Sequence, residues 1–87
     1  MLSVILFYDN SGTSKIQNLF FTNLQKEFSK KVDFKKVDAD KNKDALTKYQ
    51  IVELPTIVVE SHGRLKEKFS GLTQETFLRK AIERNMD

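Results

Sequence analysis

The chain of 87 residues contains no cysteine and no tryptophan, and it has only one histidine, one proline and three glycines. Without cysteine it can form no disulfide and carries no thiolate, so thiol–disulfide exchange is excluded. One histidine and scattered carboxylates offer no ligand cluster at the tight spacing of a zinc or transition-metal site. We therefore expect neither a metal nor any other cofactor.

Long hydrophobic runs are also missing. The most apolar segment, residues 1–8, is too short to span a membrane, has no basic leader, and meets Asp9 and Asn10 instead of a cleavage-type site. The absence of cysteine fits a reducing compartment. We expect a cytoplasmic protein without a targeting segment or membrane contact, and the length predicts a single domain over residues 1–87.

A strong excess of one charge is absent as well, because the formal net charge is only +3 and basic residues alternate with acidic ones. The densest positive stretch comprises Lys30, Lys31, Lys35 and Lys36. It lacks interleaved exposed aromatics, a glycine-rich loop and any nucleic-acid module, so we interpret it as a solvated helix end and strand edge. Binding of nucleic acid or an anionic surface is the weaker alternative, and it would require steep salt dependence.

Four segments have the pattern of β-strands, and they are residues 3–8, 32–37, 56–59 and 64–69. The first is a nearly continuous apolar run, which is typical of a central strand covered on both faces. Pro55 opens the third strand, a position where no ladder donor is needed. Ser61-His62-Gly63 predicts a hairpin turn into the fourth strand, whose charged residues fit the edge of a sheet.

The longest predicted helix follows the first strand and ends at Ser29. Ser11, Thr13 or Ser14 is available as its N-terminal cap. Apolar residues recur at helical spacing, and we expect them to form its buried face; they are Ile16, Leu19, Phe20, Leu24 and Phe28.

Two shorter helices are predicted further along the chain. Asp38-Ala39-Asp40 supplies a turn and a cap for the first, whose apolar face comprises Ala45, Leu46 and Tyr49. Thr73 is the expected cap of the second, with Leu72 and Phe77 spaced as a hydrophobic staple. The apolar face of this last helix comprises Phe77, Leu78, Ala81 and Ile82.

The order of elements is therefore β-α-β-α-β-β-α. Strands that alternate with helices require right-handed parallel crossovers in the first half, whereas the hairpin makes the second half antiparallel. The predicted fold is α/β, with a four-stranded mixed sheet and helices on both of its faces.

Five separated motifs occur together, at the same spacing, in one known family. They are Ser11-Gly12-Thr13-Ser14-Lys15, Val37-Asp38-Ala39-Asp40, the segment Lys48-Tyr49-Gln50-Ile51-Val52-Glu53-Leu54-Pro55-Thr56, Gly63 and Gly71. In the thioredoxin family the first motif reads Cys-Gly-Pro-Cys-Lys, and the match runs without a gap from the first motif to the last. The chain thus resembles a thioredoxin-like protein, and the resemblance implies a minimal thioredoxin fold.

Departures from the family pattern concentrate around the redox motif. Ser11 and Ser14 replace the two redox cysteines, Asn10 replaces the usual tryptophan, and Ile5 replaces the buried aspartate of the first strand. In the family a lysine matching Lys36 pairs with that aspartate. We therefore expect Lys36 to extend toward solvent or to find another acid.

The resemblance implies a peptide-binding groove that does not need cysteine. In relatives the proline matching Pro55 is cis, and the residue before it offers its backbone to a substrate strand. By this correspondence the predicted rim of the groove comprises Tyr8, Asn10, Gly12, Thr13, Leu54 and Pro55. An extended segment of a partner protein would bind there by β-type hydrogen bonds. We expect a redox-inactive, thioredoxin-like binding module that is not an enzyme with its present residues.

Alternatives to the binding module remain open at this point. The domain could be a scaffold in which Leu54 and Pro55 only close the core. It could also be a small thiol–disulfide oxidoreductase whose two active-site cysteines were substituted by Ser11 and Ser14. A serine nucleophile is disfavoured, because it needs an oriented base and His62 falls in the hairpin turn at the opposite end of the sheet.

Overall fold

A computed structural model of the protein describes residues 1–86. The elements, in chain order, are β1 (Leu2–Tyr8), α1 (Gly12–Phe28), β2 (Val32–Asp38), α2 (Lys43–Lys48), β3 (Thr56–Ser61), β4 (Arg64–Ser70) and α3 (Glu75–Asn85). The strands form one mixed sheet in the order β2-β1-β3-β4, in which only β1 and β2 pair in parallel. The predicted element order and sheet type are confirmed.

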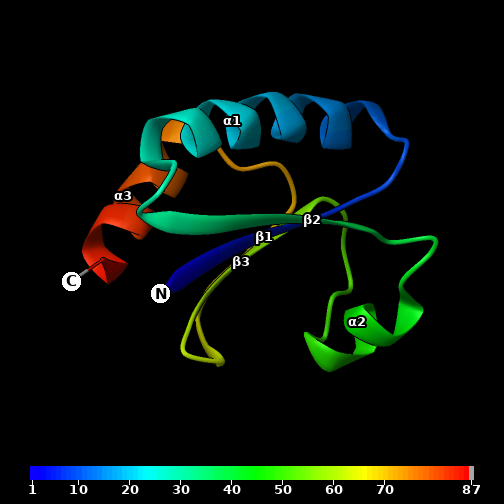
Figure 1. Cartoon of the computed structure of the whole chain (residues 1–87). Helices are drawn as coiled ribbons and strands as arrows, with labels where there is room; N and C mark the ends of the chain where they lie inside the picture. Colours follow the sequence, from blue (N-terminus) through cyan, green and yellow to red (C-terminus); the bar gives the residue numbers. More distant parts are fainter. Residues whose placement is uncertain (87) are drawn as a thin grey trace.

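The sheet is covered on both faces, as the apolar run of β1 predicts. Figure 1 shows α1 and α3 on one side of it and α2 on the other. Successive side chains of a strand point to opposite faces. Val4 and Leu6 accordingly join the larger core cluster with residues of α1 and α3, while Ile5 and Phe7 join the smaller cluster under α2. No helix in residues 1–86 is long and apolar enough to cross a membrane.

The hairpin between β3 and β4 uses a two-residue turn. His62 has φ 53° and Gly63 has φ 77°, so both lie in the left-handed region that a type I′ turn requires. The predicted turn is therefore confirmed, and β4 forms an edge of the sheet as expected.

The buried face of α1 differs from the predicted one. Leu19 is 63% exposed and Ile16 is also exposed, whereas the buried residues are Ser14, Gln17, Phe21, Leu24 and Phe28. The prediction was right for Leu24 and Phe28 and wrong for Ile16 and Leu19, because it placed only apolar residues in the core. Ser14 and Gln17 are buried with their polar atoms hydrogen-bonded, and Phe21 is fully buried where Phe20 was expected.

The predicted caps of the two shorter helices were also wrong. The turn at Asp38 forms, with the Asp40 N–H donating to Asp38 Oδ1 over 3.0 Å, but α2 begins after Asn42 and has no side-chain cap. Gln74, not Thr73, precedes α3, and the Thr73 hydroxyl donates to the Gly71 carbonyl instead.

This shift by one residue also removes the expected hydrophobic staple at the start of α3. Leu72 and Phe77 are both exposed, so Phe77 is not on the buried face of the helix as predicted. The other expected core residues of α3, Leu78, Ala81 and Ile82, are buried.

Gln17 joins α1 to the loop that precedes α3. Its side-chain amide donates to the Thr73 carbonyl over 3.0 Å and its Oε1 accepts from the Thr73 N–H over 2.7 Å. The same loop is held to the segment before β3, because the Gly71 N–H donates to the Pro55 carbonyl over 2.8 Å. Gly71 has φ 81°, a conformation that favours glycine. These bonds fix the start of α1, the loop before α3 and the segment before β3 relative to one another.

We predict that Gln17→Ala lowers the free energy of unfolding by about 2–4 kcal/mol, because it leaves the N–H and C=O of half-buried Thr73 without their Gln17 partners and opens a small cavity where buried Gln17 stood. Urea denaturation followed by circular dichroism measures the change. Gln25→Ala is the matched control, since Gln25 is exposed on the same helix, and it should change stability by less than about 0.5 kcal/mol. Equal effects of the two substitutions would contradict the role assigned to Gln17.

Candidate functional site

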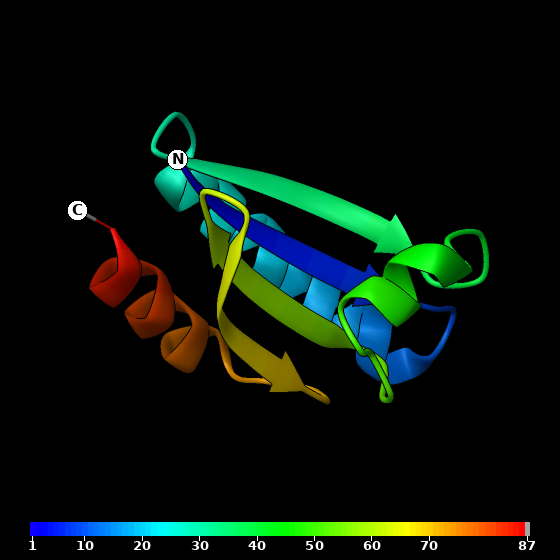
Figure 2. The same ribbon diagram turned by 90° about the horizontal axis from the view of Figure 1, so that it is seen from below.

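Three segments that carry the predicted groove residues meet at one end of the sheet. Tyr8 ends β1 and α1 begins at Gly12, while the register pairs Phe7 with Thr56 and so brings Pro55 beside the end of β1. Figure 2 shows the start of α1 and the segment that leads into β3 at this same end. The Leu54–Pro55 peptide bond is cis.

The carboxylate of Asp9 organises the start of α1. One of its oxygens, Oδ1, accepts hydrogen bonds from the Ser11 hydroxyl over 2.6 Å, the Ser14 hydroxyl over 2.8 Å and the Ser11 N–H over 3.0 Å. The Asp9 N–H in turn donates to Ser14 Oγ over 3.1 Å. Asp9 therefore binds both serines that occupy the positions of the redox motif.

Ser11 is the N-terminal cap of α1, which decides among the three candidates from the sequence. Its Oγ accepts from the Ser14 N–H over 3.2 Å, the bond that a serine cap makes to the third helical residue. Ser14 is only 2% exposed. Each hydroxyl donates its one hydrogen to Asp9, so the two serines serve the structure of the loop.

Hydrogen bonds hold the pKa of Asp9 below its ordinary value. The largest cause is the Ser11 hydroxyl, followed by the Ser11 N–H and the Ser14 hydroxyl, and together they outweigh the opposing effect of desolvation. A carboxylate with a lowered pKa is a poor general base. Asp9, the group to which both hydroxyls donate, is consequently poorly suited to activating either serine as a nucleophile.

The remaining groove residues differ in their accessibility. Asn10, Gly12 and Thr13 are exposed, Tyr8 and Leu54 are half-buried, and Pro55 is buried. Sequence reasoning missed Val52, which is 92% exposed and lies two residues before Leu54. Its exposure could have been predicted from the sequence, because Val52 stands beside charged Glu53 in a segment that is neither helix nor strand.

A hollow of about 470 Å³ adjoins the start of α1 on the side of β2. Its lining residues are Tyr8, Asp9, Asn10, Ser14, Lys15, Asn18, Leu19 and Lys36, and we call it the lysine hollow. The sequence did not place Lys15, Asn18, Leu19 or Lys36 at the site. Leu19 had been assigned to the core, and nothing in the spacing brings Lys36 of β2 next to α1.

Lys36 has no acidic partner within residues 1–86, which is one of the two outcomes expected from the sequence. Its ammonium group lies 5.9 Å from the centroid of the Phe21 ring, within the range of a cation–π contact. Register pairs Lys36 with Leu6, so Lys36 lies on the face of the sheet that α1 covers.

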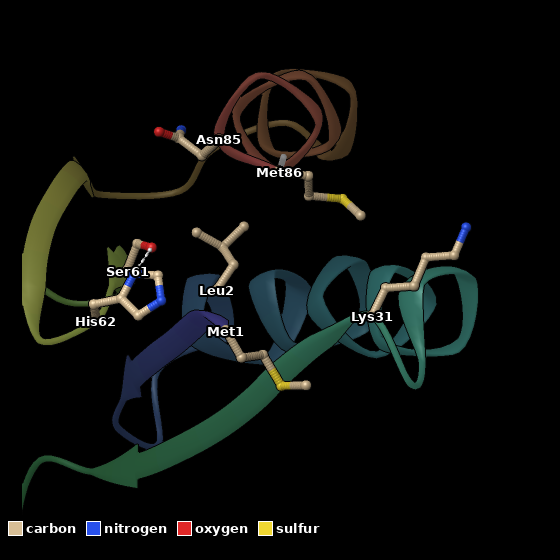
Figure 3. Close-up of a pocket in the computed structure, with 7 residues that line it drawn as sticks. All are labelled: Met1, Leu2, Lys31, Ser61, His62, Asn85 and Met86. Carbon is tan, nitrogen blue, oxygen red and sulfur yellow. Dashed lines mark hydrogen bonds between the residues drawn. The ribbon is translucent and has the colours of Figure 1, made fainter.

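The single histidine lies at the other end of the sheet. Figure 3 shows His62 and Ser61 next to the start of β1, in a smaller hollow of about 180 Å³. Ser61 Oγ and His62 Nδ1 are 3.1 Å apart, but no carboxylate of residues 1–86 lines this hollow. Within those residues, nothing there supplies the third group that orients the base of a catalytic triad.

Several known thioredoxins are similar to the chain. The thioredoxin family model matches residues 3–84. A thioredoxin from Borreliella burgdorferi is 32% identical over 77 residues, which cover 86% of this chain and 66% of the relative. Among solved structures, a Fasciola hepatica thioredoxin is 36% identical with a TM-score of 0.87, covering 95% of this chain and 79% of its own.

A solved structure described as a malarial protein matches the fold over nearly its full length. Its TM-score is 0.91, and the match covers 100% of this chain and 99% of that one. At 23% sequence identity this likeness supports the fold alone.

We predict that Asp9→Asn lowers the free energy of unfolding at pH 7 by about 1–2 kcal/mol, because asparagine can accept the same hydrogen bonds without the charge that strengthens them and favours a helix N-terminus. The pKa of Asp9 is lower in the folded chain than in the unfolded one. Its stabilising contribution is therefore complete above about pH 5 and is lost as the pH falls through the folded-state pKa.

Urea denaturation of both proteins between pH 7 and pH 2 checks this. The two stabilities should converge as the pH falls through the folded-state pKa of Asp9. Asp33→Asn is the control, since Asp33 makes only an exposed pair with Lys35 at 3.6 Å, and it should change stability by less than about 0.5 kcal/mol. A difference between Asp9→Asn and the unchanged protein that does not depend on pH would contradict the role of the charge.

Proposed function

Because the chain belongs to the thioredoxin family, we propose that it is a redox-inactive member that binds an extended segment of a partner protein at the surface around the start of α1 and the Leu54–Pro55 loop. One observation carries this proposal. At the two positions of the redox cysteines the chain has serines, and both serines donate their hydroxyl hydrogens to Asp9.

The Asp9 carboxylate makes this end of the sheet unsuited to thiol chemistry. A thiol that reacts with disulfides needs a lowered pKa, which positive neighbours or a helix N-terminus provide. A carboxylate within hydrogen-bonding distance has the opposite effect, because like charges disfavour a thiolate. The site thus lacks the nucleophile for disulfide reduction, and the nearest charged group to the two serine hydroxyls is a carboxylate that would oppose a thiolate.

The Leu54–Pro55 loop supports binding of an extended segment. Within residues 1–86, the backbone N–H and C=O of Leu54 make no hydrogen bond to another backbone group, and Leu54 lies two residues before the first residue of β3. Groups of this kind can pair with an added strand. Exposed Val52 provides an apolar contact two residues earlier. The Gly71 bond to Pro55 and the Thr56 hydroxyl bond to Glu53 hold the loop in place.

We predict that the unchanged protein does not reduce insulin disulfides and that Ser11→Cys/Ser14→Cys reduces them slowly, because Asp9 disfavours the thiolate. Adding Asp9→Asn to the double variant should raise the rate by about three- to tenfold through removal of one nearby negative charge. Turbidity with a fixed concentration of reductant measures the rate, and Asp33→Asn in the same background is the control.

A double variant as fast as an ordinary thioredoxin would contradict the proposal. It would favour the alternative that the scaffold is still adapted to disulfide reduction and that its cysteines were replaced.

We predict that Val52→Asp weakens binding of extended peptides by about tenfold, because it places a desolvated charge in the contact. Peptides are selected from a random library of unstructured ten-residue sequences, and their Kd values are measured by fluorescence anisotropy. Leu65→Asp is the matched control, since Leu65 is an exposed leucine in β4 near the hairpin turn. Equal weakening by both substitutions, or failure to select any peptide, would contradict binding at the Leu54–Pro55 loop.

A further inference from the structure

The lysine hollow is large enough to hold part of a ligand and opens beside the predicted groove. Its volume of about 470 Å³ lies within the usual range for ligand pockets, about 300–1,000 Å³. Tyr8 and Asn10 belong both to the hollow and to the groove residues expected from the sequence. A segment bound at the groove could therefore extend into the hollow.

Two cations in the lysine hollow lack acidic partners. All four ion pairs within residues 1–86 involve other residues, so neither Lys15 nor Lys36 is neutralised by a salt bridge. The Lys36 ammonium group lies 5.9 Å from the centroid of the Phe21 ring, and the Lys36 side chain is exposed, so the ammonium group is accessible to an anion. Asp9 is the one carboxylate of the lining, and its Oδ1 already accepts three hydrogen bonds.

The other walls of the hollow offer apolar contacts and amide groups. Leu19 is 63% exposed and lies in the same hollow as half-buried Tyr8. Asn10 and Asn18 also line it, and their side chains make no hydrogen bond within residues 1–86. The hollow thus combines positive charge, free amides and a small apolar surface.

We propose that the lysine hollow binds an acidic part of the partner segment. A glutamate or aspartate carboxylate contacts the Lys15 and Lys36 ammonium groups, and a neighbouring apolar side chain packs against Leu19 and Tyr8. This inference rests on the proposed function, because it names the chemistry of the segment that the groove would bind. Acidic peptide fits better than nucleic acid, since the lining has a single aromatic ring and two cations instead of a basic stripe with several stacking residues.

The test uses the same selection from a random library of ten-residue peptides against the intact protein. We expect the selected peptides to be enriched in glutamate and aspartate. Replacing those residues by glutamine and asparagine should raise Kd by about five- to tenfold at low salt, as two partly exposed ion pairs would give. Lys15→Gln/Lys36→Gln should raise the Kd of the acidic peptides by the same factor and abolish their advantage over the neutral ones.

Lys30→Gln/Lys35→Gln is the matched control, because it removes the same net charge outside the hollow and should leave Kd within twofold. Amide chemical shifts of Leu19 and Lys36 should move on addition of an acidic peptide. The selected peptides could instead lack acidic residues, bind more weakly to Val52→Asp and bind Lys15→Gln/Lys36→Gln with unchanged Kd. That result would overturn this inference while leaving the proposed function intact.

Two further outcomes would overturn the acidic-segment proposal. One outcome is that a ten-residue thymidine oligonucleotide binds more tightly than any peptide and that Lys15→Gln/Lys36→Gln abolishes this binding. That result would assign the hollow to nucleic acid instead. Failure to select any peptide would overturn both the inference and the function on which it rests.

Discussion

Three hydrogen bonds to one carboxylate oxygen of Asp9 fix the start of α1, and the surface at this end of the sheet depends on them. They use the hydroxyl hydrogens of both Ser11 and Ser14, and they keep Asp9 ionised. The same charge that stabilises the serines would oppose a thiolate in their place. At the positions of the missing cysteines, the Asp9 carboxylate thus suits hydroxyl groups better than thiolates.

The fold around this loop holds the binding surface in place through a second set of polar contacts. Gln17 bonds to both backbone groups of Thr73, and Gly71 bonds to the Pro55 carbonyl, so α1 and the Leu54–Pro55 loop are connected through the segment before α3. A rigid frame lowers the entropy lost when a flexible partner segment binds. The Leu54 backbone and exposed Val52 lie on the β3 side of the start of α1. The lysine hollow lies on the other side, toward β2.

Sequence reasoning predicted the strands, the hairpin and the covering of both sheet faces, because an apolar run and a two-residue turn are local signals. It failed where buried polar residues decide the packing. The first half of the α1 face was predicted wrongly because Ser14 and Gln17 were not expected in the core, whereas Leu24 and Phe28 are buried as predicted. The caps of the later helices depend on backbone geometry that several polar residues can satisfy. Motif spacing predicted that the serines and the Leu54–Pro55 loop belong to the site. It did not predict that Lys36 lines the lysine hollow, because only the parallel pairing of β2 with β1 brings Lys36 beside α1.

The most direct test of the central claim is an NMR titration of the Asp9 carboxyl carbon in the unchanged protein and in Ser11→Ala/Ser14→Ala. With the serines present, the pKa of Asp9 should lie clearly below its ordinary value of 3.8, and loss of both hydroxyls should raise it toward that value. A pKa at or above 3.8 in the unchanged protein, or one that does not respond to the two substitutions, would contradict the claim that the serine hydroxyls and the Asp9 charge stabilise each other.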